Sequence, residues 1–412
     1  MSDVQKTSMT RAWMVVGLLW FVAMLNYLDR LTITTMHDSL KSDIAMTEAQ
    51  FGLLTSVFLW VYAVVSPFGG FMADRFSRSR VIVGSLLVWS AVTWLTGMCH
   101  TVGQLVAARA LMGVSEACYI PAALALIADY HRGTTRSLAT GIHMSGVYAG
   151  AALGGVGGVM AMHLGWRASF SVFGGIGVVY AVVLLLLLRD APGAKAGVPD
   201  EGAGLPPIHL VAALKSLLSL PSYGVLLLHV SLLALAFWGI NGWLPTYLKE
   251  HFSMGQGAAG LSATAYIQAA SCAGILLGGA WADKWSRVNR RARILVPMFG
   301  FLLAAPALFM ATSTNVFVFA ILGLIVFGVA RGFSDANMMP ILCQVADPRY
   351  RATGYGFMNF CSCLMGGIMI YEGGELKDRH IGLGVTFQWA AVGLFVAALL
   401  LLLIRPKREA GE

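Results

Sequence analysis

The stretch Leu105–Tyr130, LVAARALMGVSEACYIPAALALIADY, decides the fold class of this chain. It is long enough to cross a membrane as a helix, which needs about 20 mostly apolar residues. Within it, Arg109 and Glu116 lie seven residues apart, which is about two helical turns, so they share one face. Because a charge at mid-membrane costs about 2.5–3.5 kcal/mol, we expect both side chains to face a polar cavity rather than lipid.

A second charged segment lies in the first apolar run of the chain, where the letters NYLDR occupy residues 26–30. Asp29 and Arg30 are adjacent, so their side chains diverge by about 100° around a helix. Four full charges in two apolar segments are costly to place in lipid. We therefore expect them to face one another and a common cavity, with the rest of the chain as its scaffold.

The composition excludes an ordinary soluble domain. The chain has 412 residues, of which 58% are hydrophobic and 12% are charged, and its mean hydropathy is +0.73. Soluble domains carry about 25% charged residues. The net charge of +8 comes from residues between the apolar runs, so it indicates orientation in a membrane and not nucleic-acid binding.

The apolar runs predict an all-α membrane protein, because a helix satisfies its own backbone in lipid and no alternating strand pattern is present. Twelve transmembrane helices can be drawn, at residues 12–35, 49–73, 81–100, 104–128, 137–162, 167–188, 222–247, 257–282, 293–312, 315–342, 352–375 and 382–404. The glycines in the fifth predict close packing, which we expect against helices of the other half of the chain. They are Gly146, Gly150, Gly154 and Gly158.

The longest connection, residues 189–221, is rich in proline and carries mixed charge. We interpret it as a cytoplasmic linker between an N-terminal six-helix bundle, residues 1–188, and a C-terminal six-helix bundle, residues 222–412. Within the linker, residues 208–220 fit a short interfacial helix.

Basic residues orient the chain. Twenty of its 28 lysines and arginines fall on the side that holds both termini and the linker, and five fall on the other side. This bias predicts cytoplasmic termini. The first apolar run is too long for a cleavable signal peptide, so we expect it to remain as a span. Short loops favour a bacterial inner membrane.

The two halves repeat one another. The letters GGFMADRFSR at 69–78 return as GGAWADKWSR at 278–287. The fourth span also has an echo in the tenth, where Arg331 and Asp335 stand in place of Arg109 and Glu116. Two parallel six-helix repeats predict a central cavity with a substrate site at mid-membrane.

The repeated loop resembles the signature between spans 2 and 3 of the major facilitator superfamily, and the resemblance covers the whole chain. Ser77 stands where that signature usually has glycine. The resemblance implies a cytoplasmic gate of Asp74, Arg75 and Arg78, with Asp283 as the counterpart in the repeat. We expect Asp74 to cap the next helix and to pair with arginines across the cytoplasmic mouth.

More narrowly, the NYLDR segment together with Arg109 and Glu116 resembles the anion:cation symporter family, which carries sugar acids and includes the sialin-like carriers. The spinster-type lysolipid carriers are a close second resemblance. The symporter resemblance implies that Arg30 binds the substrate carboxylate and that Asp29 and Glu116 carry the proton. The pocket would then be lined by Tyr27 and Tyr62.

An anion that leaves water needs a fixed positive partner, and arginine offers a planar fork that keeps its charge. Arg30 is the first candidate and Arg331 the second, with Asn359 as a further cavity residue. Arg109 is placed to tune the carboxyl groups, and we expect protonation of Asp29 or Glu116 to release an arginine for the substrate.

Two alternatives stay open, in which the charged pairs have a structural role only. Arg109 and Glu116 could form a buried pair that only fixes helix packing, and Arg331 and Asp335 could neutralise each other within one helix. If both arginines serve transport, the second one favours a bulky or highly charged anion, such as a phosphate-bearing lipid head.

These observations predict a proton-coupled symporter for an organic anion, working by alternating access of the two halves. A spinster-like proton-coupled lysophospholipid or sphingolipid transporter is the alternative. We expect no enzyme activity, cofactor or metal site, because the six cysteines lack metal spacing and no nucleophile–base set is present. The fifth span lacks the proline typical of drug/proton antiporters. The expected partners are the substrate, protons and the bilayer, with no nucleic acid, and a monomer is expected.

Overall fold

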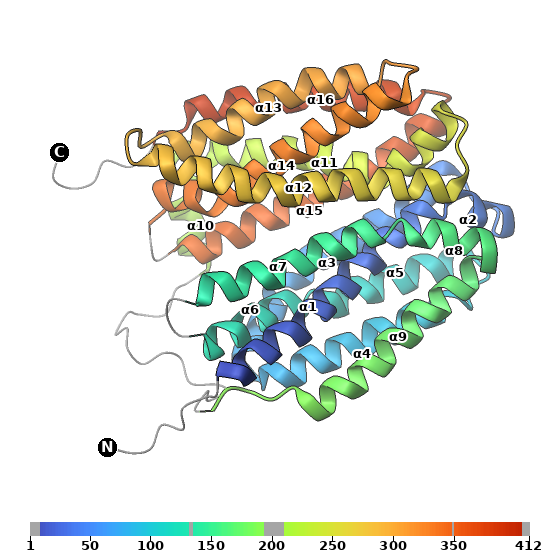
Figure 1. Ribbon diagram of the computed structural model, residues 1–412, viewed down its shortest axis with the longest axis horizontal. Helices are drawn as coiled ribbons and strands as arrows, with labels where there is room; N and C mark the ends of the chain where they lie inside the picture. The colour runs from blue at the N-terminus through green and yellow to red at the C-terminus, as the bar shows by residue number, and fades with distance from the viewer. Residues whose placement is uncertain (1–8, 132–134, 193–209, 348–349, 406–412) are drawn as a thin grey trace. The chain divides into compact units, whose positions relative to one another are not determined.

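The computed structural model describes residues 9–131, 135–192, 210–347 and 350–405, and these are almost entirely helical (Figure 1). The first half of the chain forms α1 (Met9–Thr32), α2 (His37–Asp43), α3 (Glu48–Arg75), α4 (Arg78–Thr96), α5 (Val102–Glu116), α6 (Tyr119–Tyr130), α7 (Arg136–Leu153), α8 (Val156–Leu164) and α9 (Trp166–Leu187). The second half forms α10 (Leu210–Leu218), α11 (Pro221–His251), α12 (Gln256–Ser286), α13 (Ala292–Ala311), α14 (Phe317–Val345), α15 (Arg351–Asp378) and α16 (Leu383–Leu400).

Most of the predicted spans are present as single long helices. Among the described residues, ten spans are long and apolar enough to cross a membrane, and α7 with α8 makes an eleventh that is bent by 40°. The bend falls where α7 ends and α8 begins, at Gly154 and Gly155, because glycine holds helical geometry weakly. α15 covers the remaining predicted span, 352–375, but is not among these spans, and it carries Glu372 and Glu375 near its end.

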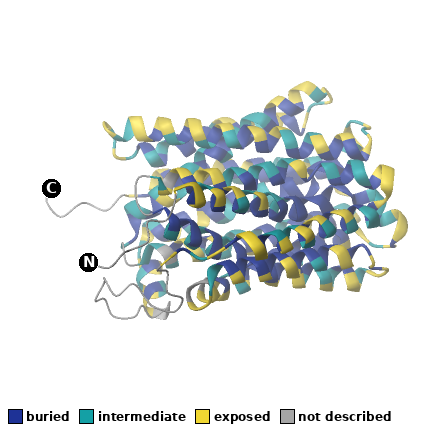
Figure 2. Cartoon of the chain, turned by 60° about the horizontal axis from the view of Figure 1, so that its bottom comes forward, coloured by how far each residue is buried: buried dark blue, intermediate teal, exposed yellow. Residues whose placement is uncertain are grey.

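The described residues form two compact units. Unit 1 comprises Met1–Met46, Val57–Leu205 and Gln256–Leu261, and unit 2 comprises Thr47–Ser56, Pro206–Gly255 and Ser262–Glu412. Each unit therefore includes a short helix segment from the other half of the sequence, namely the start of α3 in unit 2 and the start of α12 in unit 1. Buried and exposed residues alternate along the helices, so that single helices have both buried and exposed faces (Figure 2).

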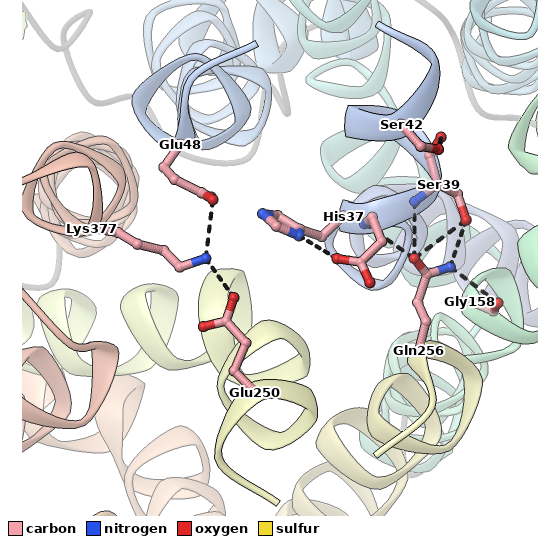
Figure 3. A network of polar contacts seen from close by, with 9 residues as sticks. His37, Ser39, Ser42, Glu48, Gly158, Glu250, Gln256 and Lys377 are labelled. Atoms are coloured by element: carbon pink, nitrogen blue, oxygen red, sulfur yellow. Dashed lines mark hydrogen bonds and ion pairs between the residues drawn. The ribbon is translucent and has the colours of Figure 1, made fainter. Parts of the chain in front are cut away.

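The start of α12 joins unit 1 through the side chain of Gln256. Its Oε1 accepts hydrogen bonds from the backbone N–H groups of Asp38 and Ser39, each at 3.1 Å, at the start of α2 (Figure 3). Its Nε2 donates to Ser39 Oγ at 2.9 Å. One amide side chain thus supplies the partners that the first turn of α2 lacks.

The start of α3 joins unit 2 through Asp378, the last residue of α15. The carboxylate accepts hydrogen bonds from the backbone N–H groups of Glu48 and Ala49, each at 2.9 Å. Slight burial of Asp378 raises its pKa, but the hydrogen bonds outweigh it and hold the pKa of this carboxyl below its ordinary value. Asp378 therefore acts as a cap for α3 supplied by another helix.

We expect this cap to weaken in acid. A carboxyl with a lowered pKa in the folded state stabilises the fold at neutral pH, and the contribution disappears as the pH falls through that lowered pKa. The unfolding temperature of the unmodified chain should exceed that of Asp378→Ala at pH 7. The difference should shrink below about pH 4, near the ordinary pKa of aspartate. A difference that acidification leaves unchanged would contradict this role.

Helix packing in unit 1 depends on glycines in α7, which lies against α1. A Cβ on Gly146 would come within 2.5 Å of the Trp20 carbonyl oxygen, and one on Gly150 within 2.0 Å of the Met24 carbonyl oxygen. The expectation that these glycines face helices of the other half was therefore wrong for both positions. Spacing alone identifies a close contact but not the partner helix.

The packing of α7 against α1 allows a matched test. Gly150→Ala would place a methyl group against backbone, so we expect it to cost about 1–3 kcal/mol, as overpacking does. Gly141→Ala lies on the same helix, where a Cβ meets nothing within 4 Å. It should be neutral or stabilise by about 0.5–1 kcal/mol. Thermal unfolding of the purified variants measures both, and equal effects would contradict the packing role.

The helix α10 confirms a short helix within the predicted segment 208–220. Leu217 of α10 is buried in a core cluster of unit 2 together with Tyr223 and Leu226 of α11. The hydroxyl of Tyr223 donates to the Gly354 carbonyl oxygen of α15 at 2.9 Å. This helix is therefore part of the packed core of unit 2.

Candidate functional site

The central feature of unit 1 is a buried ion pair between two helices. Arg30, near the end of α1, donates from Nε to Glu116 Oε2, at the end of α5, at 2.7 Å. The two side chains are 4% and 0% exposed. A buried pair with such geometry is costly to break, because removing one partner leaves an uncompensated charge. Sequence spacing had linked Glu116 with Arg109 on its own helix, whereas the hydrogen-bonded partner comes from α1.

Three aromatic rings surround the Arg30 guanidinium. Its central carbon lies 4.7 Å from the Tyr27 ring centroid, 5.0 Å from that of Phe58 and 4.5 Å from that of Tyr62. Tyr27 and Tyr62 were predicted as lining residues, and the structure places both against Arg30. Aromatic faces stabilise a guanidinium by about 2 kcal/mol or more where water is excluded.

Phe58 was not predicted, although it contacts two arginines. The Arg109 guanidinium carbon lies 4.7 Å from the Phe58 centroid, so this single ring serves both Arg30 and Arg109. Arg109 also donates from Nη1 to the sulfur of Met112 at 3.3 Å. The uncharged Phe58 ring therefore contacts two guanidinium groups of like charge near the Glu116 carboxylate.

Asp29 points away from Arg30, as adjacent helical residues should. Its Oδ2 accepts a hydrogen bond from the hydroxyl of Thr93, on α4, at 3.3 Å. Asp29 and Arg30 therefore reach different helices from neighbouring positions on α1. The sequence carried no signal for Thr93, because a lone threonine in an apolar span is common.

The four charges are almost completely covered by protein. Asp29 and Arg30 are each 4% exposed, Arg109 is 1% exposed and Glu116 is 0% exposed. Of the four charges, Arg30 and Glu116 face one another directly, through their ion pair. One donor group of Arg30 is not used, because its Nη2 has no hydrogen-bond partner among the described residues.

The second candidate arginine lies in unit 2 and is neutralised within its own helix. Arg331 donates from Nε to Asp335 Oδ1 at 3.0 Å and to Oδ2 at 2.9 Å, both on α14. Its guanidinium carbon lies 3.3 Å from the ring centroid of Phe237, on α11. Both charged side chains are partly exposed. Asn359, on α15, is exposed and is bonded to neither of them in any described contact.

The signature loop between α3 and α4 shows how its charges pair. Arg78 forms an ion pair with Asp129 of α6, and Arg75 is exposed beside the ring of Phe71. The side chain of Asp74 lies outside the described residues. In the repeat, Asp283 accepts from Arg293 Nη2 at 3.0 Å within unit 2.

The start of α4 has two described caps, whereas the predicted cap by Asp74 depends on a side chain outside the described residues. The start of α4 is capped by Ser77, whose hydroxyl accepts from the Arg80 N–H. It is also capped by Asp190, which accepts from the Ser79 N–H at 2.8 Å and from the Ser77 hydroxyl.

Buried charges in unit 1 do not form a metal site. Among the described residues, no group of three or more histidine, cysteine, aspartate or glutamate side chains could hold a metal ion. The paired arginines and carboxylates instead suit exchange of partners, in which a proton or an anion replaces one member of a pair.

Three curated relatives are similar to the chain over most of its length. An MFS-type efflux pump of Mycolicibacterium smegmatis is 27% identical over 399 residues, which are 94% of this chain and 90% of that protein. Protein spinster homolog 1 of Homo sapiens is 27% identical over 385 residues, which are 86% of this chain and 71% of that protein. A probable sulfoacetate transporter, SauU, of Cupriavidus necator is 26% identical over 410 residues, which are 95% and 94%.

These relatives support a transporter over an enzyme and bear on one narrower expectation. The spinster protein matches the second of the two resemblances.

The fold also matches a solved structure. A bacterial homolog to the human lysosomal transporter Spinster superposes with a TM-score of 0.77 and 21% sequence identity, over 97% of this chain and 96% of that one. The family model described as Major Facilitator Superfamily matches residues 19–370, which is most of the sequence. Because this model covers well over half of the sequence, the chain belongs to the Major Facilitator Superfamily.

Proposed function

We propose that this chain is a secondary active transporter of an organic anion, such as a sugar acid or another carboxylate, driven by symport of protons. The observation that carries the proposal is the state of Arg30. Its Nε is bonded to Glu116 at 2.7 Å, while its buried Nη2 has no partner among the described residues. A buried guanidinium with one free donor is half of a bidentate anion site.

Proton coupling follows from competition for Arg30. While Glu116 is ionised, it holds the Nε donor. Once Glu116 takes a proton, its attraction to the guanidinium weakens, and an anion can occupy both donors. The rings of Tyr27, Phe58 and Tyr62 would keep the guanidinium in place during this exchange. Asp29 is the second candidate proton carrier, and Arg109 biases both carboxyl groups.

We also assign roles in transport to residues outside the Arg30 cluster, and these roles do not identify the substrate. In unit 2, Arg331 and Asn359 are proposed as substrate-binding residues and Asp335 as a proton-coupling residue, with Asp335 released from Arg331 when the anion binds. The motif residues Asp74, Arg75, Arg78 and Asp283 are proposed as the cytoplasmic gate. The excess of basic residues on one side supports cytoplasmic termini in a bacterial inner membrane.

A lysolipid carrier is the second candidate function. Similarity to protein spinster homolog 1 favours it, and so does the aromatic surround of Arg30, which suits a charged head group next to an apolar chain. Both candidates share the same chemistry at Arg30, namely an anionic head bound by a guanidinium.

Uptake into proteoliposomes tests the proposal and separates the two candidates. The purified chain is reconstituted, a proton gradient is imposed, and uptake of sulfoacetate, a hexuronate and lysophosphatidic acid is measured against protein-free liposomes. Gradient-dependent uptake of the small anions supports the first function, and uptake of lysophosphatidic acid alone supports the second. If none of the three accumulates, the proposed substrate class is wrong.

A further inference from the structure

The helix α3 is held at its start by α15 of unit 2. Besides the cap by Asp378, the Lys377 ammonium lies 3.0 Å from Glu48 Oε1 and 2.6 Å from Glu250 Oε1. Figure 3 shows Lys377 between these two carboxylates, which come from α3 and α11. The Lys377, Glu48 and Glu250 side chains are 16%, 12% and 45% exposed, so water reaches this cluster.

Over its next two turns, α3 packs so closely against α15 that its residues approach the backbone of α15. A Cβ on Gly52 would come within 2.7 Å of the Ile370 carbonyl oxygen. The Ser56 hydroxyl lies 2.7 Å from the Gly367 carbonyl oxygen. Close approach of this kind leaves little room for sliding, so we expect residues 48–56 to move with α15.

Two residues further on, α3 is fixed to a different helix. A Cβ on Gly113 of α5 would come within 2.8 Å of the Phe58 carbonyl oxygen and 3.3 Å of the Tyr62 nitrogen. The rings of Phe58 and Tyr62 lie 6.0 Å apart, nearly parallel, and both contact the Arg30 guanidinium. The change of unit, between Ser56 and Val57, therefore falls directly before the site.

Nothing in the sequence gives α3 a hinge at this point. Residues 53–66 contain neither glycine nor proline, the usual causes of sharp helix bends. A displacement of residues 48–56 is therefore passed on to Phe58. The partly exposed Lys377 cluster is also cheaper to break than the buried pair of Arg30 and Glu116.

We propose that α3 couples the contacts made by Lys377 and Asp378 to the position of Arg30, with Phe58 and Tyr62 as positioning residues. When the end of α15 releases α3, the two rings shift and the guanidinium loses its alignment for the anion. The proposal rests on the proposed function, because it assigns Arg30 the task of anion binding.

A double-mutant cycle on uptake kinetics tests this coupling. The half-saturating concentration is measured for whichever of sulfoacetate, the hexuronate and lysophosphatidic acid is transported. Asp378→Ala and Phe58→Leu should each raise it, and the double variant should raise it no further than Phe58→Leu alone. Substitutions at distant, independent residues have effects that add. The proposal is therefore overturned if the two single effects add in the double variant, so that its half-saturating concentration exceeds that of Phe58→Leu by more than the error of about two-fold.

Two control variants separate coupling from general damage. Asp378→Asn keeps an oxygen that can cap α3, so its half-saturating concentration should stay close to that of the unmodified chain. Arg379→Ala changes the residue directly after α15, whose guanidinium lies 3.8 Å from the Glu375 carboxylate, and should have no effect. If Asp378→Asn behaves like Asp378→Ala, the cap is not the coupling element.

Hydrogen–deuterium exchange of the full chain in lipid nanodiscs tests the coupling without a substrate. Asp378→Ala should speed exchange at residues 59–63 as well as at 49–53, and Arg379→Ala should change neither segment. Faster exchange confined to residues 49–53 would overturn the proposal. If no anion is transported but exchange spreads to residues 59–63, the proposed function fails while the coupling stands.

Discussion

Arg30→Ala is expected to abolish both gradient-driven uptake and anion exchange. The guanidinium is the only positive group on α1 within the described cluster, and its Nη2 is the donor held ready for the anion. Loss of a buried charged hydrogen-bond partner costs about 2–5 kcal/mol of binding, so transport at low substrate should fall by at least about 30-fold. Uptake of radiolabelled anion into proteoliposomes measures the loss.

Arg30→Ala also leaves Glu116 buried without its partner, which should destabilise the fold by about 3–5 kcal/mol. The double variant Arg30→Ala/Glu116→Gln removes that unpaired charge. We expect it to recover much of the thermal stability and none of the transport. Transport by a stable double variant would show that Arg30 serves packing and not anion binding.

Glu116→Gln is expected to separate exchange from accumulation. Glutamine keeps the size of the side chain but cannot bind or release a proton. The substrate anion then no longer competes with a carboxylate at position 116 for the Arg30 guanidinium. The variant should exchange internal for external anion, because Arg30 stays available. Its accumulation under a proton gradient should drop to an inside-to-outside ratio of about one, since no differential proton binding remains to shift the carrier's equilibrium.

Asp29→Asn is the matched comparison for Glu116→Gln. Asp29 lies next to Arg30 in sequence but bonds to Thr93 of α4, so it is not the carboxylate that holds the guanidinium. If Asp29→Asn loses accumulation while Glu116→Gln keeps it, the proton is carried on the α4 side of the cluster. Gradient-driven accumulation that survives in Glu116→Gln would overturn its coupling role.

Much of the fold and the identity of the charged residues could be predicted from the sequence. Full charges in apolar runs are rare, so Arg30, Arg109 and Glu116 stand out without any structure. The pairing between them could not be predicted, because spacing along one helix reports only shared faces. The hydrogen-bonded partner of Glu116 depends on how α1 and α5 pack, which is a tertiary property.

Apolar site residues were the main omission. Phe58 is one of 21 phenylalanines, most of which face lipid or fill cores in a protein of this class. Its role depends on two arginines from two other helices, so no local pattern identifies it. The assignment of residues 47–56 to unit 2 was equally hidden, because it results from the docking of Glu48 and Ala49 on Asp378.

Simultaneous recording of proton and anion entry in the unmodified chain tests the central claim most directly. Proteoliposomes are loaded with a pH-sensitive dye, and labelled anion uptake is followed at the same time. If a proton on Glu116 frees Arg30 for the anion, every increment of anion uptake should be accompanied by acidification of the lumen. In Glu116→Gln, both the acidification and the accumulation of anion beyond equal inside and outside concentrations should be lost. Anion accumulation without acidification would contradict proton-coupled transport by this site.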